Sequence, residues 1–157
     1  MSFSNAMAQL ITTIQAVTPA VDPDLPFVFD EDGDGHVSPL EDLAGARHRA
    51  CDLRVLTYPT DDGESGLTTL RFRARVGLRV LYVAERDRAT LERAIAEDTA
   101  LLVQAILDIA AWDPAVVSIP PPGPPTVEER LGGNPIPQRL GFVLTIPFDL
   151  VYLSAGP

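Results

Sequence analysis

Residues 68–84 read TTLRFRARVGLRVLYVA, and this stretch decides the fold. Successive side chains of a β-strand point to opposite faces of the sheet. Here one face carries only apolar groups, which are Leu70, Phe72, Ala74, Val76, Leu78, Val80 and Tyr82. The other face carries Arg71, Arg73, Arg75 and Arg79, with Gly77 interrupting the row. The pattern therefore predicts a long strand with one face for a core and four guanidinium groups along about 25–30 Å of the other.

The arginine row has two readings. Acidic residues on neighbouring strands can neutralise it as an ordinary solvated sheet face. Alternatively it is an intersubunit or partner surface, because arginine is favoured in interface ion pairs. The chain has a net charge of −10, so the natural mate is a carboxylate patch on a neighbouring copy. We therefore single out Arg71, Arg73, Arg75 and Arg79 as candidate interface residues.

The remaining sequence predicts the elements that pack around this strand. Helices are expected over 4–17, 39–49 and 87–111, and strands over 53–58, 115–119 and 138–153. Strand 53–58 pairs with the long strand as a hairpin, and strand 138–153 alternates in the same way. Pro147 cannot donate to a ladder, which places it at a sheet edge or a bulge. The predicted fold is a single α+β domain, with a mainly antiparallel sheet of two long strands and helices packed on one face.

Two segments do not fit regular elements. Residues 120–137 contain PPPGPP and GGNPIP, which predict a stiff, Pro/Gly-rich extended loop. Loops of this length inside a compact domain tend to be functional or disordered. The other is the acidic segment 29–42.

Within that segment, residues 30–41 read DEDGDGHVSPLE, the spacing of an EF-hand calcium loop. The expected ligands are Asp30, Asp32, Asp34, the carbonyl of His36, Ser38 and a bidentate Glu41. Residues 38–41 also form a capping box, which starts a helix with or without metal. Pro19, Pro23 and Pro26 interrupt the incoming helix of a full EF-hand. We expect a structural Ca²⁺ site, and the alternative is an acidic turn.

The composition of the chain argues against several classes of function. No apolar run reaches the ~20 residues needed to span a bilayer, and no signal pattern opens the chain, so we expect synthesis inside the cell and no membrane partner. The net charge opposes nucleic-acid binding by the surface as a whole. The two histidines, His36 and His48, and the single Cys51 make no catalytic constellation. We therefore expect a protein that is not an enzyme.

The order of four predicted elements is characteristic. It runs from the helix at 4–17 through the arginine-alternating strand and the helix at 87–111 to the late strand RLGFVLTI at 139–146. This order resembles the tail terminator (tail completion) proteins of long-tailed bacteriophages. The acidic loop departs from that pattern and looks like an insertion. The resemblance implies a virion protein that forms a ring, usually a hexamer. Such a ring caps the tail tube and joins it to the head–tail connector, with the genome passing through its lumen.

Two alternatives remain open at this point. One is a calcium-binding or calcium-stabilised bacterial interaction module that uses the acidic loop. The other is a different head–tail connector or neck component.

Overall fold

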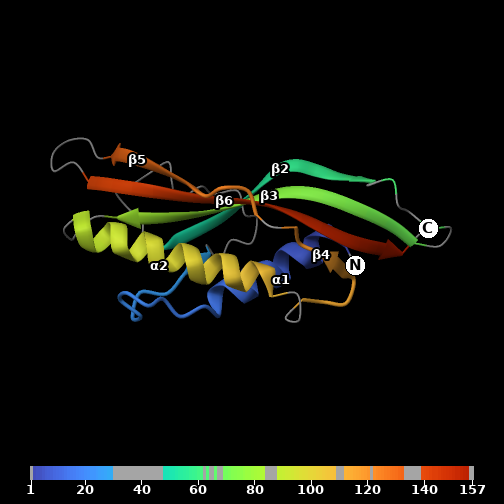
Figure 1. Ribbon diagram of the computed structural model, residues 1–157, viewed down its shortest axis with the longest axis horizontal. Coiled ribbons are helices and arrows are strands. Elements are labelled where there is room, and N and C mark those ends of the chain that lie inside the picture. Colours follow the sequence, from blue (N-terminus) through green and yellow to red (C-terminus); the bar gives the residue numbers. More distant parts are fainter. Residues whose placement is uncertain are drawn as a thin grey trace.

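The computed structural model describes residues 2–29, 48–61, 63, 66, 69–83, 88–108, 112–120, 122–132 and 139–155. Within these residues, two helices and six strands form one α+β unit (Figure 1). The helices are α1 (Phe3–Gln15) and α2 (Arg88–Leu107). The strands are β1 (Val28–Phe29), β2 (Ala50–Asp61), β3 (Thr69–Val83), β4 (Val116–Ser118), β5 (Thr126–Gly132) and β6 (Arg139–Ala155).

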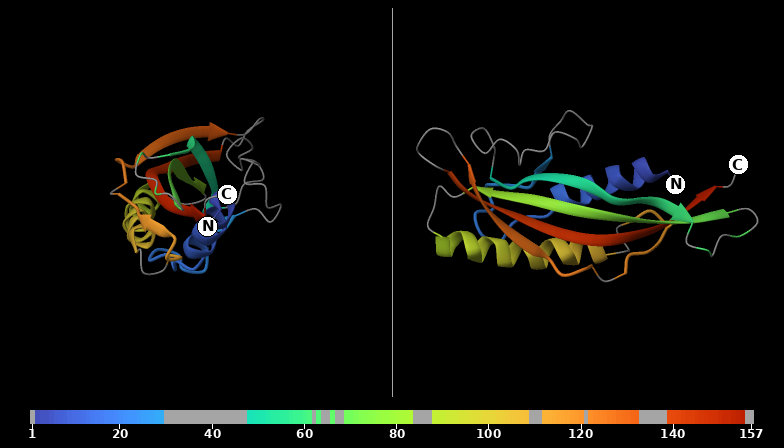
Figure 2. Two further views of the ribbon diagram at one scale, coloured as in Figure 1. Left: turned by 90° about the vertical axis from the view of Figure 1, so that its right-hand side faces the viewer. Right: turned by 90° about the horizontal axis from the view of Figure 1, so that it is seen from above.

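The sheet confirms the predicted class. Its order is β1-β2-β3-β6-β4, and β5 also pairs with β6. Of the described pairings, the one between β1 and the start of β2 is parallel and the others are antiparallel. The two long strands, β3 and β6, pair along their whole length from Thr69–Ala155 to Val83–Gly141. Figure 1 places both helices beneath the same face of the sheet, and the end-on view in Figure 2 shows the sheet curving over them.

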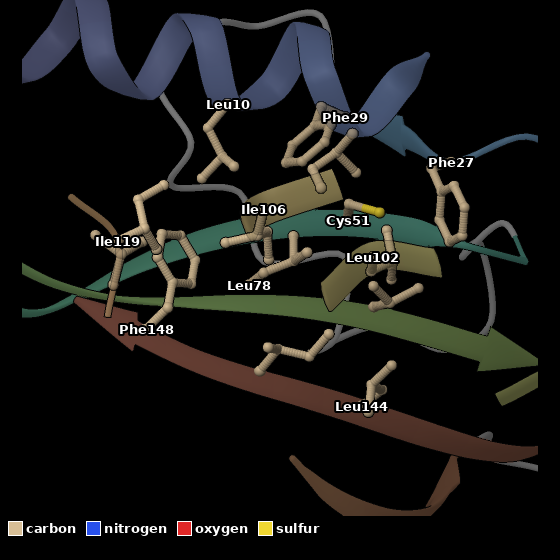
Figure 3. Packing of buried hydrophobic residues seen from close by; sticks show 14 of the residues in the cluster. Leu10, Phe27, Phe29, Cys51, Leu78, Leu102, Ile106, Ile119, Leu144 and Phe148 are labelled. Atoms are coloured by element: carbon tan, nitrogen blue, oxygen red, sulfur yellow. The ribbon is translucent and has the colours of Figure 1, made fainter. Parts of the chain in front are cut away.

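The main core lies between that face and the helices (Figure 3). Leu10 from α1 and Leu102 and Ile106 from α2 meet alternate residues of the two long strands. Those residues include Val76, Leu78, Val80 and Tyr82 on β3, and Leu144, Ile146 and Phe148 on β6. The alternating apolar residues from Val76 to Tyr82 thus line the core, as their spacing predicts. A second, small cluster of Ala50, Leu81, Val83 and Val143 lies on the opposite face.

Three predicted boundaries were wrong. Residues 126–132 lie within the predicted loop 120–137 but form β5, which pairs with β6 from Thr126–Thr145 to Gly132–Arg139. No proline lies between Pro125 and Pro135, so residues 126–132 have the N–H groups that a ladder needs. Strand β2 continues through Pro59 to Asp61. At the end of the predicted helix 39–49, His48 and Arg49 form a turn.

Pro147 lies in the centre of the sheet but at a local break. The N–H of Gly123 donates to its carbonyl at 2.9 Å. The nitrogen and carbonyl of one strand residue point to the same side, so the proline nitrogen faces the stretch between β4 and β5. In the described chain, β5 pairs with β6 only as far as Thr145, and β4 pairs from Val151 onward. The missing N–H therefore costs no ladder bond, in line with the edge-like position that its chemistry predicts.

Among the helices of the described residues, none is long and apolar enough to cross a membrane.

Candidate functional site

The arginine row lies on the face of the sheet that is turned away from the helices. We call this face the arginine face. The placement follows from the alternation of β3, whose even-numbered side chains from Val76 to Tyr82 enter the main core. The four arginines are not equivalent on this face. Arg73 and Arg75 are exposed, Arg71 is half-buried and Arg79 is buried.

Arg79 is neutralised within the fold. It lies directly opposite Asp52 of β2. Its Nε donates to Asp52 Oδ1 at 2.7 Å, and its Nη2 contacts Oδ2. Both residues are largely shielded from solvent, at 7% and 4% exposure. A two-pronged pair of this kind fixes the register of the β2–β3 hairpin. Arg79 therefore stabilises the pairing of β2 with β3, and we leave it out of the candidate interface.

Arg73 and Arg75 stand further along the same face. Across β6, Arg75 lies opposite Asp149 and Arg73 opposite Val151. Among the ion pairs that the described residues form, none involves either arginine. The proline-rich segment approaches Arg75, because a Cβ added at Gly123 would lie 3.3 Å from Arg75 Nη2.

Two residues of β2 join these arginines. Arg54 is exposed and lies opposite Gly77, so it shares the arginine face. Leu56 covers Gly77, since a Cβ there would come within 3.4 Å of Leu56 Cδ1, yet Leu56 stays 50% exposed. A register shift between Val55 and Thr57 turns Leu56 onto this face, as β-bulges do. Pattern reasoning missed both residues, because only the pairing of β2 with β3 reveals their side.

We call Arg54, Leu56, Arg73 and Arg75 the arginine patch. Next to it, on the same edge strand, Tyr58 is 76% exposed. Strands β2 and β3 together carry five arginines and two acidic residues. The whole chain, by contrast, has a net charge of −10. The patch is thus a basic and partly apolar area on an acidic protein, and arginine and tyrosine are enriched at protein–protein interfaces.

A separate polar network is buried where β2 begins. Arg49 is fully buried, and its Nε and Nη2 donate to the carboxylate of Asp98 on α2 at 2.6 and 3.3 Å. Its remaining N–H groups reach the carbonyls of Val21, Asp22 and Leu25 at 2.6, 3.1 and 2.9 Å. All five donors of the guanidinium therefore have acceptors.

The network ties four parts of the chain together: the segment after α1, the start of β2, β3 and α2. The hydroxyl of Tyr82 on β3 also donates to Asp98, at 2.9 Å. The guanidinium of Arg49 lies over the ring of Phe27, 5.6 Å from its centroid. Arg49 has a φ of 59°, a left-handed conformation that costs a side-chain-bearing residue roughly 1–2 kcal/mol. The bonds of Arg49 offset that cost, and they link the segment after α1, the start of β2 and α2. The sequence gives no local signal of this network.

Burial suppresses the reactivity of the nearby titratable groups. It raises the pKa of the Cys51 thiol, and burial beside Asp98 raises the pKa of Tyr82 well above its usual value. Both groups therefore remain protonated at neutral pH. Burial, aided by the charge of Arg49, lowers the pKa of His48. The His48 ring stands edge-on to Tyr82, with centroids 5.5 Å apart. These groups pack and form hydrogen bonds as parts of the fold: Cys51 and Tyr82 donate, and His48 Nδ1 accepts from the N–H of Val83 at 3.4 Å.

The calcium ligands expected at Asp30, Asp32, Asp34, His36, Ser38 and Glu41 lie outside the described residues. The structure does describe the sheet on either side of the loop. Val28 and Phe29 pair with Ala50 and Cys51, and the N–H of Val28 donates to the carbonyl of Arg49 at 3.1 Å. Any order that a bound ion gave the loop would therefore act between two strands that already pair. The described part of the chain holds no cluster of three or more His, Cys, Asp or Glu that could bind a metal.

No protein-family model matches the chain, and no curated protein is detectably similar to it in sequence.

Proposed function

We propose that this chain is a structural subunit that assembles with copies of itself into a ring at the head-proximal end of a phage tail. The observation that carries the proposal is the arginine patch, an exposed basic and apolar area on a protein with a net charge of −10. Each copy offers both the basic patch and an acidic remainder. A copy is therefore an electrostatically suitable partner for another copy.

The charge pattern favours a head-to-tail contact. A two-fold contact through the patch would set arginines of one copy against arginines of its partner, and like charges that face each other weaken an interface. A contact between the patch and a different, acidic surface avoids that repulsion. Head-to-tail contacts of this kind generate rings where the rotation closes.

The assignment to a phage tail rests on the resemblance in element order. The α+β sheet is compatible with it, because both described helices lie beneath one face and the arginine patch on the other face is exposed (Figure 1). In this role the ring, usually a hexamer, contacts the tail-tube protein on one side and the head–tail connector on the other. The acidic charge of the chain would repel the phosphates of DNA that passes through the lumen.

The test is the mass of the particle in solution, measured by light scattering at micromolar concentration and moderate salt. We expect a closed oligomer for the wild-type chain and a shift toward monomer for Arg73→Glu. Arg93→Glu, a matched charge reversal at an exposed position of α2, should leave the mass unchanged. A wild-type chain that stays monomeric at every concentration would contradict the proposal.

The acidic loop supports a second candidate, a calcium-stabilised interaction module. The same measurement with a chelator separates the two. A ring that survives chelation with lower thermal stability fits a structural ion, because metal bound to the native state adds to folding free energy. A monomer whose partner binding is switched by calcium would favour the module.

A further inference from the structure

Among the described strands, β2 and β5 each leave a long edge unpaired, on opposite sides of the sheet, and the two edges differ in chemistry. Along β2, only Ala50 and Cys51 pair with β1, so among the described strands nothing flanks β2 from Asp52 to Asp61. At the other side of the sheet, β5 pairs only with β6 in the described chain.

Strand β2 overlaps β5 along the sheet only at its start, up to Asp52, which is level with Arg79 and Thr145, and the rest of β2 lies in the other half. Strand β5 follows β6 from Arg139 to Thr145, whereas Thr57 of β2 is level with Arg75 and hence with Asp149. Figure 1 shows this separation, with β5 at one end of the long sheet and β2 running toward the other.

The chemistry of β5 complements the arginine patch. Residues 126–129 read TVEE, and all four are exposed. Val127 is 51% exposed and shares one face of β5 with Glu129, level with Leu144 and Phe142, whereas Glu128 lies on the arginine face, level with Val143. Glu129 forms a long, exposed pair with Arg88 at 3.4 Å, and such surface pairs exchange at little cost. On the patch, Leu56 is 50% exposed and covers Gly77, which lies opposite Arg54.

We propose that β5 of one copy is the surface that the arginine patch of the next copy binds. The inference rests on the proposed function, because it names the acidic partner in the head-to-tail contact. Within one sheet β2 and β5 run in opposite directions, since three antiparallel pairings separate them. Two copies with roughly aligned sheets, one of them displaced along its strands relative to the other, therefore bring the patch end of β2 and β5 together antiparallel, the commoner way for strands to meet.

The contact is made by side chains and not by one continuous ladder. Pro59 lacks an N–H, and two register shifts interrupt β2 between Val55 and Thr60. Prolines and bulges of this kind prevent an outer strand from adding further strands indiscriminately. Arginine–carboxylate pairs around Leu56 and Val127 then supply selectivity.

A charge swap tests the pairing. Variant A carries Arg73→Glu and Arg75→Glu, variant B carries Glu128→Arg and Glu129→Arg, and a third chain carries all four changes. Variants A and B should each weaken assembly about tenfold or more, because each sets like charges against each other. The chain with all four changes should return to within about threefold of wild type. An equimolar mixture of A and B should also assemble, since each patch then meets an opposite charge.

The matched control is Glu92→Arg with Glu97→Arg on α2. It makes the same change in net charge and also removes a partner of Arg88, because Arg88 bonds to Glu92 at 3.0 Å. This control should assemble like wild type. Circular dichroism establishes that every variant is folded.

The outcomes separate this inference from the proposed function. A wild-type monomer overturns both. A wild-type ring that variant B leaves intact overturns the β5 contact and keeps the ring. Loss of assembly in A and B without recovery in the chain with all four changes shows that the two surfaces do not face each other, which also overturns the contact.

Discussion

The buried pair of Arg49 and Asp98 makes the sharpest stability prediction. The substitution Asp98→Asn keeps the size of the side chain but removes its charge, and it leaves the Arg49 guanidinium buried without a counter-ion. Arg49 and Asp98 are both completely buried and meet at 2.6 Å. Breaking a buried ion pair by removing one partner costs roughly 3–5 kcal/mol. We expect a loss of that size in the free energy of unfolding.

The companion variants should follow a definite order. Tyr82→Phe removes one hydrogen bond to Asp98 but leaves the ion pair, so it should cost roughly 1.5–3 kcal/mol, the range for a bond to a charged group. Glu97→Gln on the exposed side of α2 is the control, and it should stay within about 0.5 kcal/mol of wild type. Combined Arg49→Met and Asp98→Asn should cost less than the sum of the two single changes, because one change has already broken the pair.

Urea unfolding followed by far-ultraviolet circular dichroism measures these differences. For a chain of 157 residues, each kcal/mol moves Tm by about 2–4 °C, so Asp98→Asn should melt roughly 6–20 °C lower. A loss below about 1 kcal/mol for Asp98→Asn would refute the reasoning. So would a larger loss for Tyr82→Phe than for Asp98→Asn.

Three further predictions concern single groups. The pKa of His48 is lowered in the folded state, so the folded chain binds fewer protons than the unfolded chain. The free energy of unfolding should therefore fall as pH drops below about 6.5, by at most about 1.4 kcal/mol per pH unit. The variant His48→Gln should lack this part of the pH dependence between pH 6.5 and 5. The buried Cys51 thiol, whose pKa burial raises, should react with a thiol reagent only when the chain opens, so added urea should speed the reaction in step with unfolding. Calcium at about 100 times its dissociation constant should stabilise the wild type by about 2.7 kcal/mol, and Asp30→Ala with Asp32→Ala should abolish that gain.

Each of these three predictions would be contradicted by a specific result. An equally steep loss of stability in His48→Gln would assign the pH dependence to other groups. Fast labelling of Cys51 in native buffer would contradict its burial in the core between the sheet and the helices. A melting temperature that calcium leaves unchanged would make the segment 30–41 an acidic turn.

Much of the fold is readable from alternation, because β3 and β6 each bury one face against the helices. Val76, Leu78, Val80 and Tyr82 needed no tertiary information, since a period of two along a strand already places them on one side. The same alternation placed all four arginines on the other side. It did not reveal that Arg79 pairs with Asp52, because that contact depends on the register between β2 and β3.

The features that alternation missed depend on contacts between distant segments. Arg49 reaches Asp98 across 49 positions of the chain, and nothing near either residue signals the pair. Strand β5 escaped prediction because its short, charged sequence pairs with β6 alone among the described strands. The patch residues Arg54 and Leu56 became visible only once β2 was aligned on β3.

Native mass spectrometry of the unmodified chain at micromolar concentration tests the ring most directly. We predict one closed species, at six times the chain mass of 16.9 kDa if the ring is the usual hexamer, which falls apart as salt rises because charged contacts hold it together. A chain that remains at 16.9 kDa across concentration and salt, with or without calcium, would contradict the ring.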